Sequence, residues 1–162
     1  KKNTTEVWKS TMQTSPIRLI NFTDLDETQM RMVLLWRNHN KIRQMMHTKH
    51  IITFAEHLHF ISELKTRNDI RHFLVQGTQY LGVIAFKDAH IGIYSNPALR
   101  GMGKILMPLI IKYGFEELML KKLIAEVYAN NQTAINLYKK FNFEQTSRNE
   151  DTLTMELKNE NS

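Results

Sequence analysis

The sequence contains no cysteine, which excludes disulfide bonds and thiolate metal sites. It also has no apolar run that approaches the roughly 20 residues a helix needs to cross a membrane. Residues 1–16 are polar and basic with no apolar block behind them, so we expect no secretory signal. These absences predict a cytoplasmic protein without a membrane partner.

The chain has a formal net charge of +6, and its Lys and Arg residues are scattered along the sequence. No block of five or more Lys or Arg occurs. A basic protein binds nucleic acid, or it attracts a small polyanion such as a nucleotide or coenzyme. The scattered charge favours the small anion. No RNP-like or helix-turn-helix signature is present, so we predict no nucleic-acid partner.

A chain of 162 residues with 42% hydrophobic residues predicts one domain, at 17–162, behind a flexible tail at 1–16. Thr23 or Asp24 is expected to cap the first helix, and Thr53 with Glu56 predicts a capping box on the third. Hydrophobic periodicity predicts strands at 17–22, 71–76, 79–86, 90–95 and 122–129, helices at 23–38, 41–46, 54–65, 102–120 and 131–141, and a closing hairpin within 141–157. This order indicates an α/β fold around a mixed sheet.

Two glycines one residue apart, Gly101 and Gly103, stand among basic residues where a strand gives way to a helix. One interpretation is a plain turn that needs glycine. The other is a phosphate cradle, because a helix N-terminus presents free N–H groups and glycine lets a ligand approach the backbone closely. In that case the N–H groups of Arg100, Met102 and Lys104 would contribute, and the side chains of Arg100 and Lys104 would add charge.

A second motif follows the next strand: Asn131, then Ala134, then Leu137 and Tyr138, with Phe143 further on. Together with the glycine pair, these residues resemble the GNAT superfamily of N-acetyltransferases over about 17–158. The resemblance implies a central mixed, mostly antiparallel twisted sheet flanked by helices. Two positions depart from the family pattern. Ala98 replaces a Gln or Arg, and Asn142 replaces a Gly that Asn can imitate in the left-handed conformation.

The resemblance further implies that acetyl-CoA is the co-substrate. Its diphosphate would contact the backbone at 99–104, and its pantetheine would pair with main-chain groups near Ile91 and Ile93, as an added strand does. Asn131 would contact the coenzyme, although a helix cap explains this residue equally well. The residues assigned to the coenzyme are thus Ile91, Ile93, Leu99, Arg100, Gly101, Met102, Gly103, Lys104 and Asn131. We expect no metal, since no Asp, Glu or Cys cluster completes a site with the histidines.

Acetyl transfer needs a neutral amine and a proton for the departing thiolate. The resemblance makes Tyr138 the general acid, with a buried core tyrosine as the alternative. Glu126 stands among apolar residues of a strand expected to be buried, and burying a lone carboxylate is costly unless it is used or paired. It is therefore our candidate base, acting through a water, or else a structural ion pair with a Lys or Arg.

A narrower resemblance connects the segments at 34–46, 54–64, 80–86 and 91–107 with bacterial N-acetyltransferases of pseudaminic acid biosynthesis. These acetylate the 4-amino group of a UDP-linked sugar. Arg37, His57 and Tyr94 would bind this acceptor. The alternatives are a surface ion pair for Arg37, a solvated helix face for His57 and core packing for Tyr94.

An enzyme of the same class could instead acetylate another acceptor, namely a protein N-terminus, a polyamine or an antibiotic. A homodimer is also left open. The join at 87–89 is shorter than the family usually has, which predicts either a tight turn or residues of a mobile loop missing from the sequence.

Overall fold

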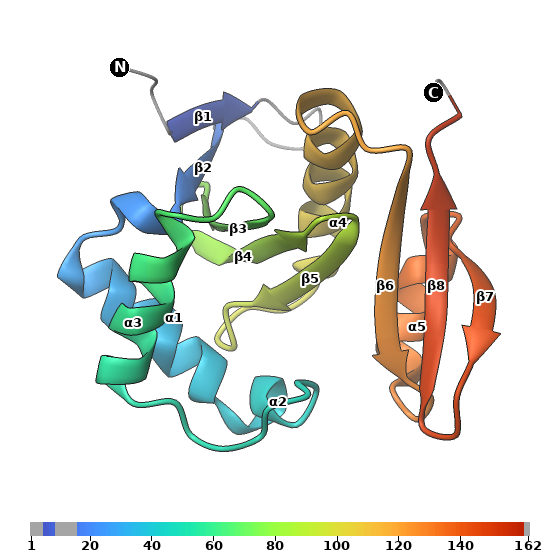
Figure 1. The fold of residues 1–162 in the computed structure, drawn as a ribbon, viewed down its shortest axis with the longest axis horizontal. Coiled ribbons are helices and arrows are strands. Elements are labelled where there is room, and N and C mark those ends of the chain that lie inside the picture. The colour runs from blue at the N-terminus through green and yellow to red at the C-terminus, as the bar shows by residue number, and fades with distance from the viewer. Residues whose placement is uncertain (1–4, 9–15, 161–162) are drawn as a thin grey trace.

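The fold is a single eight-stranded sheet with helices on both faces, as the computed structural model shows for residues 5–8 and 16–160 (Figure 1). The strand order is β1-β2-β3-β4-β5-β6-β8-β7, and every neighbouring pair is antiparallel except β5 and β6. The strands are β1 (Thr5–Trp8), β2 (Ile17–Asn21), β3 (Ile70–Gln76), β4 (Tyr80–Lys87), β5 (His90–Ser95), β6 (Lys122–Tyr128), β7 (Glu144–Arg148) and β8 (Thr152–Lys158). The predicted α/β class with a mixed, mostly antiparallel sheet is confirmed.

Seven helical segments cover this sheet. They are η1 (Phe22–Asp24), α1 (Glu27–Asn38), α2 (Asn40–Arg43), α3 (Phe54–Leu64), α4 (Gly103–Lys112), η2 (Tyr113–Glu117) and α5 (Gln132–Lys140) within the described residues. Alternation along the strands supplies two cores. On β3, Phe73 and Val75 join the core under α4 and α5, whereas Leu74 joins the core under α1 and α3. The central strands are therefore apolar on both faces.

The helix boundaries partly follow the expected signals. Thr53 and Glu56 form the predicted capping box of α3, with Glu56 N–H donating to Thr53 Oγ1 at 3.1 Å. The predicted cap of α1 at Thr23 or Asp24 is wrong. These residues belong to the short 3₁₀ turn η1, and Asp26 caps α1 through a box with Gln29. The predicted helix at 102–120 is α4 continued by the π-helical turn η2, and it ends before Leu118.

The N-terminal segment contributes a strand that was not expected. Thr5 to Trp8 form β1, which pairs with β2 in antiparallel register, Thr5 opposite Ile20. The remaining positions of the predicted tail, 1–4 and 9–15, lie outside the described residues. The division into a flexible tail and a single domain therefore stays a prediction.

Strands β5 and β6 meet at one end only. Their single register pair is His90 with Ile124, supported by the Ile124 N–H that donates to the Ala89 carbonyl at 2.9 Å. Figure 1 shows the two strands diverging from this point, so the sheet opens between them. Within the described residues this divergence leaves the edge of β5 without a sheet partner along most of its length.

One conformational expectation at a single residue is confirmed. Asn142, in the position of the family glycine, has φ 71°, the left-handed conformation that Asn tolerates. In the chain as given, β4 ends at Lys87 and β5 begins at His90, and a tight turn with Asp88 at φ 49° joins them. Both explanations of this short join stay predictions.

Candidate functional site

A cavity of about 1040 Å³ opens where β5 and β6 diverge, between the α1–α3 side and the β6–α5 side of the molecule. We call it the central cavity. It collects residues from distant parts of the sequence, since β5, β6 and α5 contribute walls together with α1, α3 and the segment that follows α2. Eight of the predicted site residues line it, namely Arg37, His57, Ile91, Ile93, Tyr94, Glu126, Asn131 and Tyr138.

The glycine loop at 99–104 lies beside this cavity and not in its wall. Gly101 has φ +72° and open space around it, so the chain turns there at low cost only with glycine. At Gly103 a Cβ would come within 2.7 Å of Leu137 Cδ2, so glycine permits close packing of α4 on α5. The Met102 cap makes no side-chain hydrogen bond, and the first N–H groups of α4 have no intrahelical acceptor.

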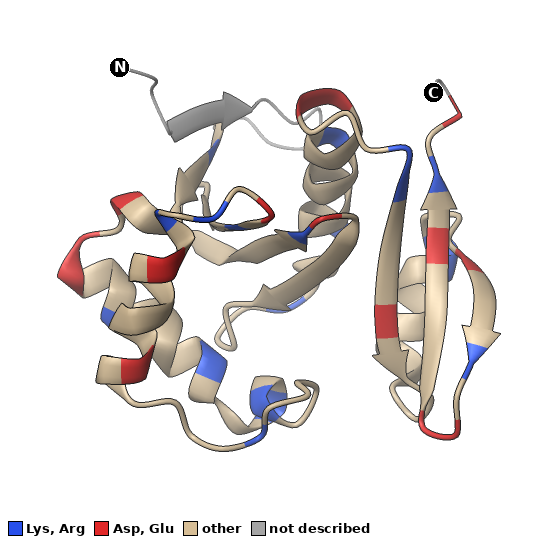
Figure 2. Cartoon of the chain, in the orientation of Figure 1, with Lys and Arg blue, Asp and Glu red and all other residues tan. Residues whose placement is uncertain are grey.

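The side chains of this loop divide by burial. Leu99 and Met102 pack against the core, whereas Arg100 and Lys104 are exposed. Lys and Arg elsewhere are spread over most elements, as Figure 2 shows. The loop thus has the exposed cations and the helix N-terminus of an anion cradle, and its binding role stays a prediction.

Tyr138 lies on α5 with its ring 5.1 Å from that of Phe143, centroid to centroid. The residue is 9% exposed and borders the central cavity. Burial raises the pKa of Tyr138 to about 12, because removing water disfavours the phenolate. The site therefore contains a phenol that stays protonated at neutral pH and can donate a proton.

The expected burial of Glu126 is wrong. Strand β6 alternates, with Leu123, Ala125 and Val127 in the core and Glu126 on the opposite side, where it lines the central cavity. Its side chain is 47% exposed, so the argument from the cost of burying a carboxylate does not apply. Among the described residues its ion-pair partner is His47, and not a Lys or Arg. The assignment of Glu126 as the catalytic base therefore depends only on its position in the wall of the central cavity, and it stays a prediction.

Asn131 serves as the N-cap of α5, the alternative that the sequence left open. Its Oδ1 accepts a hydrogen bond from Ala134 N–H at 3.2 Å. Its Nδ2 also lies 3.0 Å from Sδ of Met45, in the segment that follows α2. The amide is thus oriented at the cavity edge, and a coenzyme contact stays a prediction.

Arg37 extends from α1 into the central cavity. One of its nitrogens, Nη2, donates to the Thr48 carbonyl at 3.0 Å, which orients the guanidinium. Within the described residues Nη1 is buried and has no hydrogen-bond partner, and burial lowers the pKa of Arg37. Arg37 also acts on Tyr94. Burial raises the pKa of the Tyr94 hydroxyl, and the positive charge of Arg37 opposes that rise. Among the residues that the structure describes, Arg37 bonds to a backbone carbonyl and not to a carboxylate, so they do not give it the surface ion pair of the alternative interpretation.

The alternative of a solvated helix face is wrong for His57, which is 6% exposed. The sequence reading also missed His72 on β3, whose ring lies 5.2 Å from that of Phe22 and 4.9 Å from that of Phe60. Burial lowers the pKa of His72 to about 4. The available signal was that His72 alternates with the apolar residues Ile70 and Leu74, which places it on the same face of the strand as they are.

The segment at 44–50 was also missed, although it crosses the cavity to reach β6. The Tyr128 hydroxyl donates to the Met46 carbonyl at 3.4 Å, and Lys49 Nζ lies 4.5 Å from the Tyr128 ring centroid. No local pattern in the sequence indicates this contact, because it joins positions about eighty residues apart.

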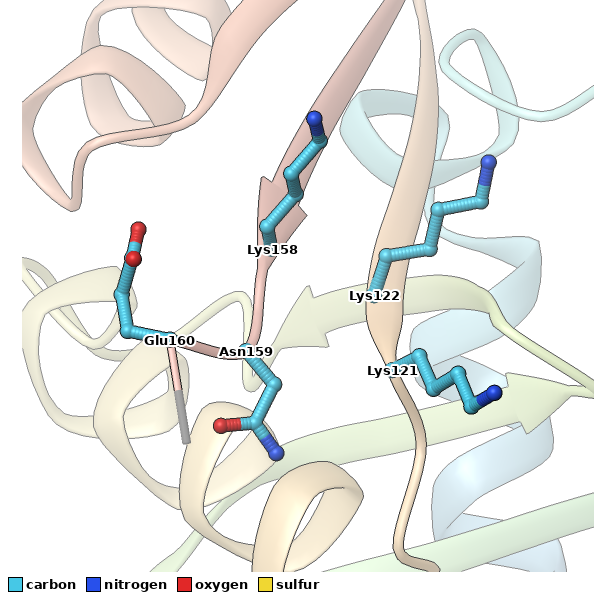
Figure 3. Close-up of a pocket in the computed structure, with 5 residues that line it drawn as sticks. All are labelled: Lys121, Lys122, Lys158, Asn159 and Glu160. Atoms are coloured by element: carbon cyan, nitrogen blue, oxygen red, sulfur yellow. The ribbon is translucent and has the colours of Figure 1, made fainter. Parts of the chain in front are cut away.

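Three other findings bear on function. In the described part of the chain, no group of three or more His, Cys, Asp or Glu is placed to hold a metal ion. The same part contains no helix long and apolar enough to cross a membrane. A second hollow of about 500 Å³ is lined by Lys121, Lys122, Lys158, Asn159 and Glu160, whose side chains point in different directions (Figure 3).

Comparisons with known proteins agree with this geometry. Residues 36–143 match the acetyltransferase (GNAT) family. Acetyltransferase PseH of Campylobacter jejuni subsp. jejuni serotype O:23/36 (strain 81-176) is 42% identical over 133 residues, covering 78% of this chain and 84% of the relative. The same enzyme of serotype O:2 is 41% identical over the same shares.

Solved structures give the same result. The crystal structure of Campylobacter jejuni N-acetyltransferase PseH in complex with acetyl coenzyme A has a TM-score of 0.76 and 34% identity, covering 88% of this chain and 98% of that one. Spermidine N-acetyltransferase from Vibrio cholerae in complex with CoA and spermine has a TM-score of 0.77 at 18% identity, covering 88% and 95%, a likeness of fold alone. The chain therefore belongs to the GNAT acetyltransferase family, and it is an acetyl-CoA-dependent N-acetyltransferase.

Proposed function

We propose that this enzyme transfers an acetyl group from acetyl-CoA to the 4-amino group of a UDP-linked amino-dideoxy sugar, UDP-4-amino-4,6-dideoxy-N-acetyl-β-L-altrosamine, in pseudaminic acid biosynthesis. The observation that carries the proposal is the 42% identity to Acetyltransferase PseH over 84% of that relative. A shared family alone would leave the acceptor open, because one fold serves many substrates.

The coenzyme half of the proposal uses the open edge of β5. The loop at 99–104 would hold the diphosphate, and main-chain groups of Ile91 and Ile93 would pair with the pantetheine amides. This path leads from the start of α4 toward the central cavity, where Tyr138 and Asn131 lie. The Ile93 N–H is our candidate donor to the thioester oxygen.

Two protein groups account for the proton transfers of the reaction. The neutral amine of the sugar attacks the thioester carbon, and the C–S bond breaks as the C–N bond forms. The amine proton passes to Glu126 through a water, and the Tyr138 hydroxyl gives its proton to the departing thiolate. Glu126 and Tyr138 come from β6 and α5, on the same side of the central cavity.

The acceptor half uses the other wall. Arg37 offers a planar fork suited to a diphosphate, and Tyr94 and His57 line the adjoining surface. The wall of this cavity carries charges of both signs, with Arg37 and Lys87 beside Asp88, Glu56 and Glu126, so it is not the uniformly acidic wall that suits a polycation such as spermidine. The resemblance to the spermidine enzyme is one of fold alone, so it does not favour a polyamine.

The setting of the reaction is part of the same proposal. We place the enzyme in the cytoplasm, where its product would serve flagellin glycosylation. A homodimer stays a prediction, and light scattering coupled to size-exclusion chromatography measures it directly.

The test is an acceptor panel. The purified enzyme is incubated with acetyl-CoA and, separately, the UDP-4-amino sugar, other UDP-amino sugars, spermidine and a peptide with a free N-terminus. We expect mass spectrometry to show one added acetyl group on the UDP-4-amino sugar, with much slower reaction of the others. Preferential acetylation of spermidine or the peptide would contradict the proposal.

A further inference from the structure

One end of the central cavity is built from two imidazoles and two phenyl rings, and the imidazole of His57 is buried while that of His72 is partly buried. His57 on α3 and His72 on β3 both line the cavity, and Phe22 lies beside both, with ring centroids at 6.3 Å from His57 and 5.2 Å from His72. Phe60 closes the other side of His72 at 4.9 Å. We call Phe22, His57, Phe60 and His72 the imidazole end of the central cavity.

The surroundings of His57 favour one tautomer. Within the described residues its Nε2 is buried without a hydrogen-bond partner. A backbone hydrogen bond with Met30 acts to raise the pKa of His57, which is the effect of a carbonyl that accepts a proton from the ring, and Nδ1 is the ring nitrogen left to donate it. A neutral imidazole with its proton on Nδ1 has a lone pair on Nε2, so this atom can only accept.

The surroundings also keep the pair uncharged. Burial is the main reason that the pKa of His57 is lowered, and the Met30 carbonyl only partly opposes it. Burial lowers the pKa of His72 to about 4, and a charge on His57 would lower it further. In the described part of the chain no carboxylate contributes to either shift, so no negative charge there favours a proton on Nε2 of His57.

We propose that the imidazole end of the central cavity receives an uncharged N–H or O–H donor of the acceptor, with Nε2 of His57 accepting that hydrogen bond. The phosphate groups of the acceptor, which are themselves acceptors of hydrogen bonds, would then lie elsewhere. This inference depends on the proposed function for the identity of the acceptor. In a UDP-linked sugar the donor is either the N3–H of the pyrimidine or a hydroxyl of the hexose.

The phenyl rings support an uncharged ring at this position. Phe22 and Phe60 give apolar walls that favour a planar base or the apolar face of a sugar over a solvated diphosphate. An acceptor nitrogen left without a partner in such a wall is costly, so a ligand that supplies an N–H or O–H gains both the contact and the relief of that cost.

The first experiment needs no ligand. Nitrogen-15 NMR of the histidine rings in the intact enzyme at neutral pH reports the tautomer of His57. We expect a bare Nε2 and a proton on Nδ1. A protonated Nε2 or a charged ring would overturn the inference, whatever the acceptor proves to be. The measurement therefore separates failure of this inference from failure of the proposed function.

The second experiment uses calorimetric titration of wild type, His57→Phe and His57→Gln with UDP, N3-methyl-UDP, the UDP-sugar and pyrophosphate. His57→Phe keeps a ring but removes the acceptor, whereas His57→Gln can place an amide oxygen near the position of Nε2. His59→Phe is the matched control, because His59 lies on the same helix with its side chain 75% exposed.

We expect His57→Phe to weaken the UDP-sugar about tenfold, with partial recovery in His57→Gln. Pyrophosphate binding should not change. If N3-methyl-UDP binds more weakly than UDP to wild type but not to His57→Phe, the donor is the N3–H of the base. If His57→Phe weakens the UDP-sugar but not UDP, the donor is a hydroxyl of the hexose. An equal loss of pyrophosphate in His57→Phe would overturn the inference, because the residue would then be holding phosphate.

Discussion

Nε2 of His47 lies 3.7 Å from Oε2 of Glu126, so the segment after α2 meets β6 across the central cavity. Both side chains are substantially exposed, which makes the pair weak in energetic terms. The pair matters for its location, because it places an imidazole and a carboxylate together on the face of β6 where the proposed proton relay operates.

Replacing Glu126 tests that relay. Glu126→Gln keeps the shape and removes the base, so we expect kcat to fall about 100-fold while KM for acetyl-CoA changes little. His47→Gln should lower kcat less, because His47 reaches the relay only through Glu126. Release of CoA, followed with a thiol reagent, measures both. Glu144→Gln on the exposed strand β7 is the control. An unchanged kcat in Glu126→Gln would remove this carboxylate from proton transfer.

Tyr138→Phe tests the general acid. The ring can keep its packing on Phe143, so the fold should survive while the proton donor is lost. We expect kcat to fall at least tenfold, with the affinity for acetyl-CoA nearly unchanged in calorimetry. In wild type the pKa of about 12 keeps the phenol protonated, so kcat should not fall through loss of this proton until the pH approaches that value. Normal turnover of the variant would exclude Tyr138 from the mechanism.

Arg37 provides a test of the acceptor wall. Removing the guanidinium in Arg37→Ala should weaken the UDP-sugar about tenfold and leave acetyl-CoA binding intact. Arg37→Lys keeps the charge without the planar fork, so we expect partial recovery. Arg31→Ala is matched to it, since Arg31 lies on the same helix and pairs with Glu27 at 3.4 Å. If Arg37→Ala reduced both affinities equally, the assignment of Arg37 to the acceptor would be wrong.

The partly buried imidazole of His72 should make the enzyme less stable in acid. Its pKa is about 4 when folded and near 6.5 when unfolded, so the unfolded chain binds more protons between these values. The free energy of unfolding should therefore decrease as the pH falls from 6.5 toward 4. The loss at pH 5 relative to pH 7 is on the order of 2 kcal/mol from His72, and His57 acts in the same direction.

Urea denaturation at the two pH values measures this loss. His72→Phe removes the titrating group, so the difference between pH 7 and pH 5 should shrink in that variant. His59→Gln, an exposed histidine on α3, should leave the difference as it is in wild type. An equal acid-dependent loss in wild type and His72→Phe would show that other groups cause it.

The sequence by itself determined the features that depend on neighbours in the chain. Hydrophobic spacing predicted nearly every strand and helix, and the Thr53–Glu56 box marked the start of α3, because capping needs only residues three apart. Asn142 stands where the family has a glycine, and it was expected to tolerate the left-handed conformation. Its φ of 71° agrees, because Asn can adopt this conformation at the end of a helix. The glycine pair and the Asn131–Tyr138 motif indicated the family for the same local reason.

Only the tertiary structure decided which side chains face the central cavity. The apolar neighbours of Glu126 suggested a buried carboxylate. The alternation of β6 and its divergence from β5 instead turn that residue toward the opening. The ring contacts of His57 and His72 with Phe22, and the crossing of residues 44–50 to β6, likewise join segments far apart in the sequence. Local patterns specify the period of an element, whereas the packing of distant elements sets which of its faces meets a ligand.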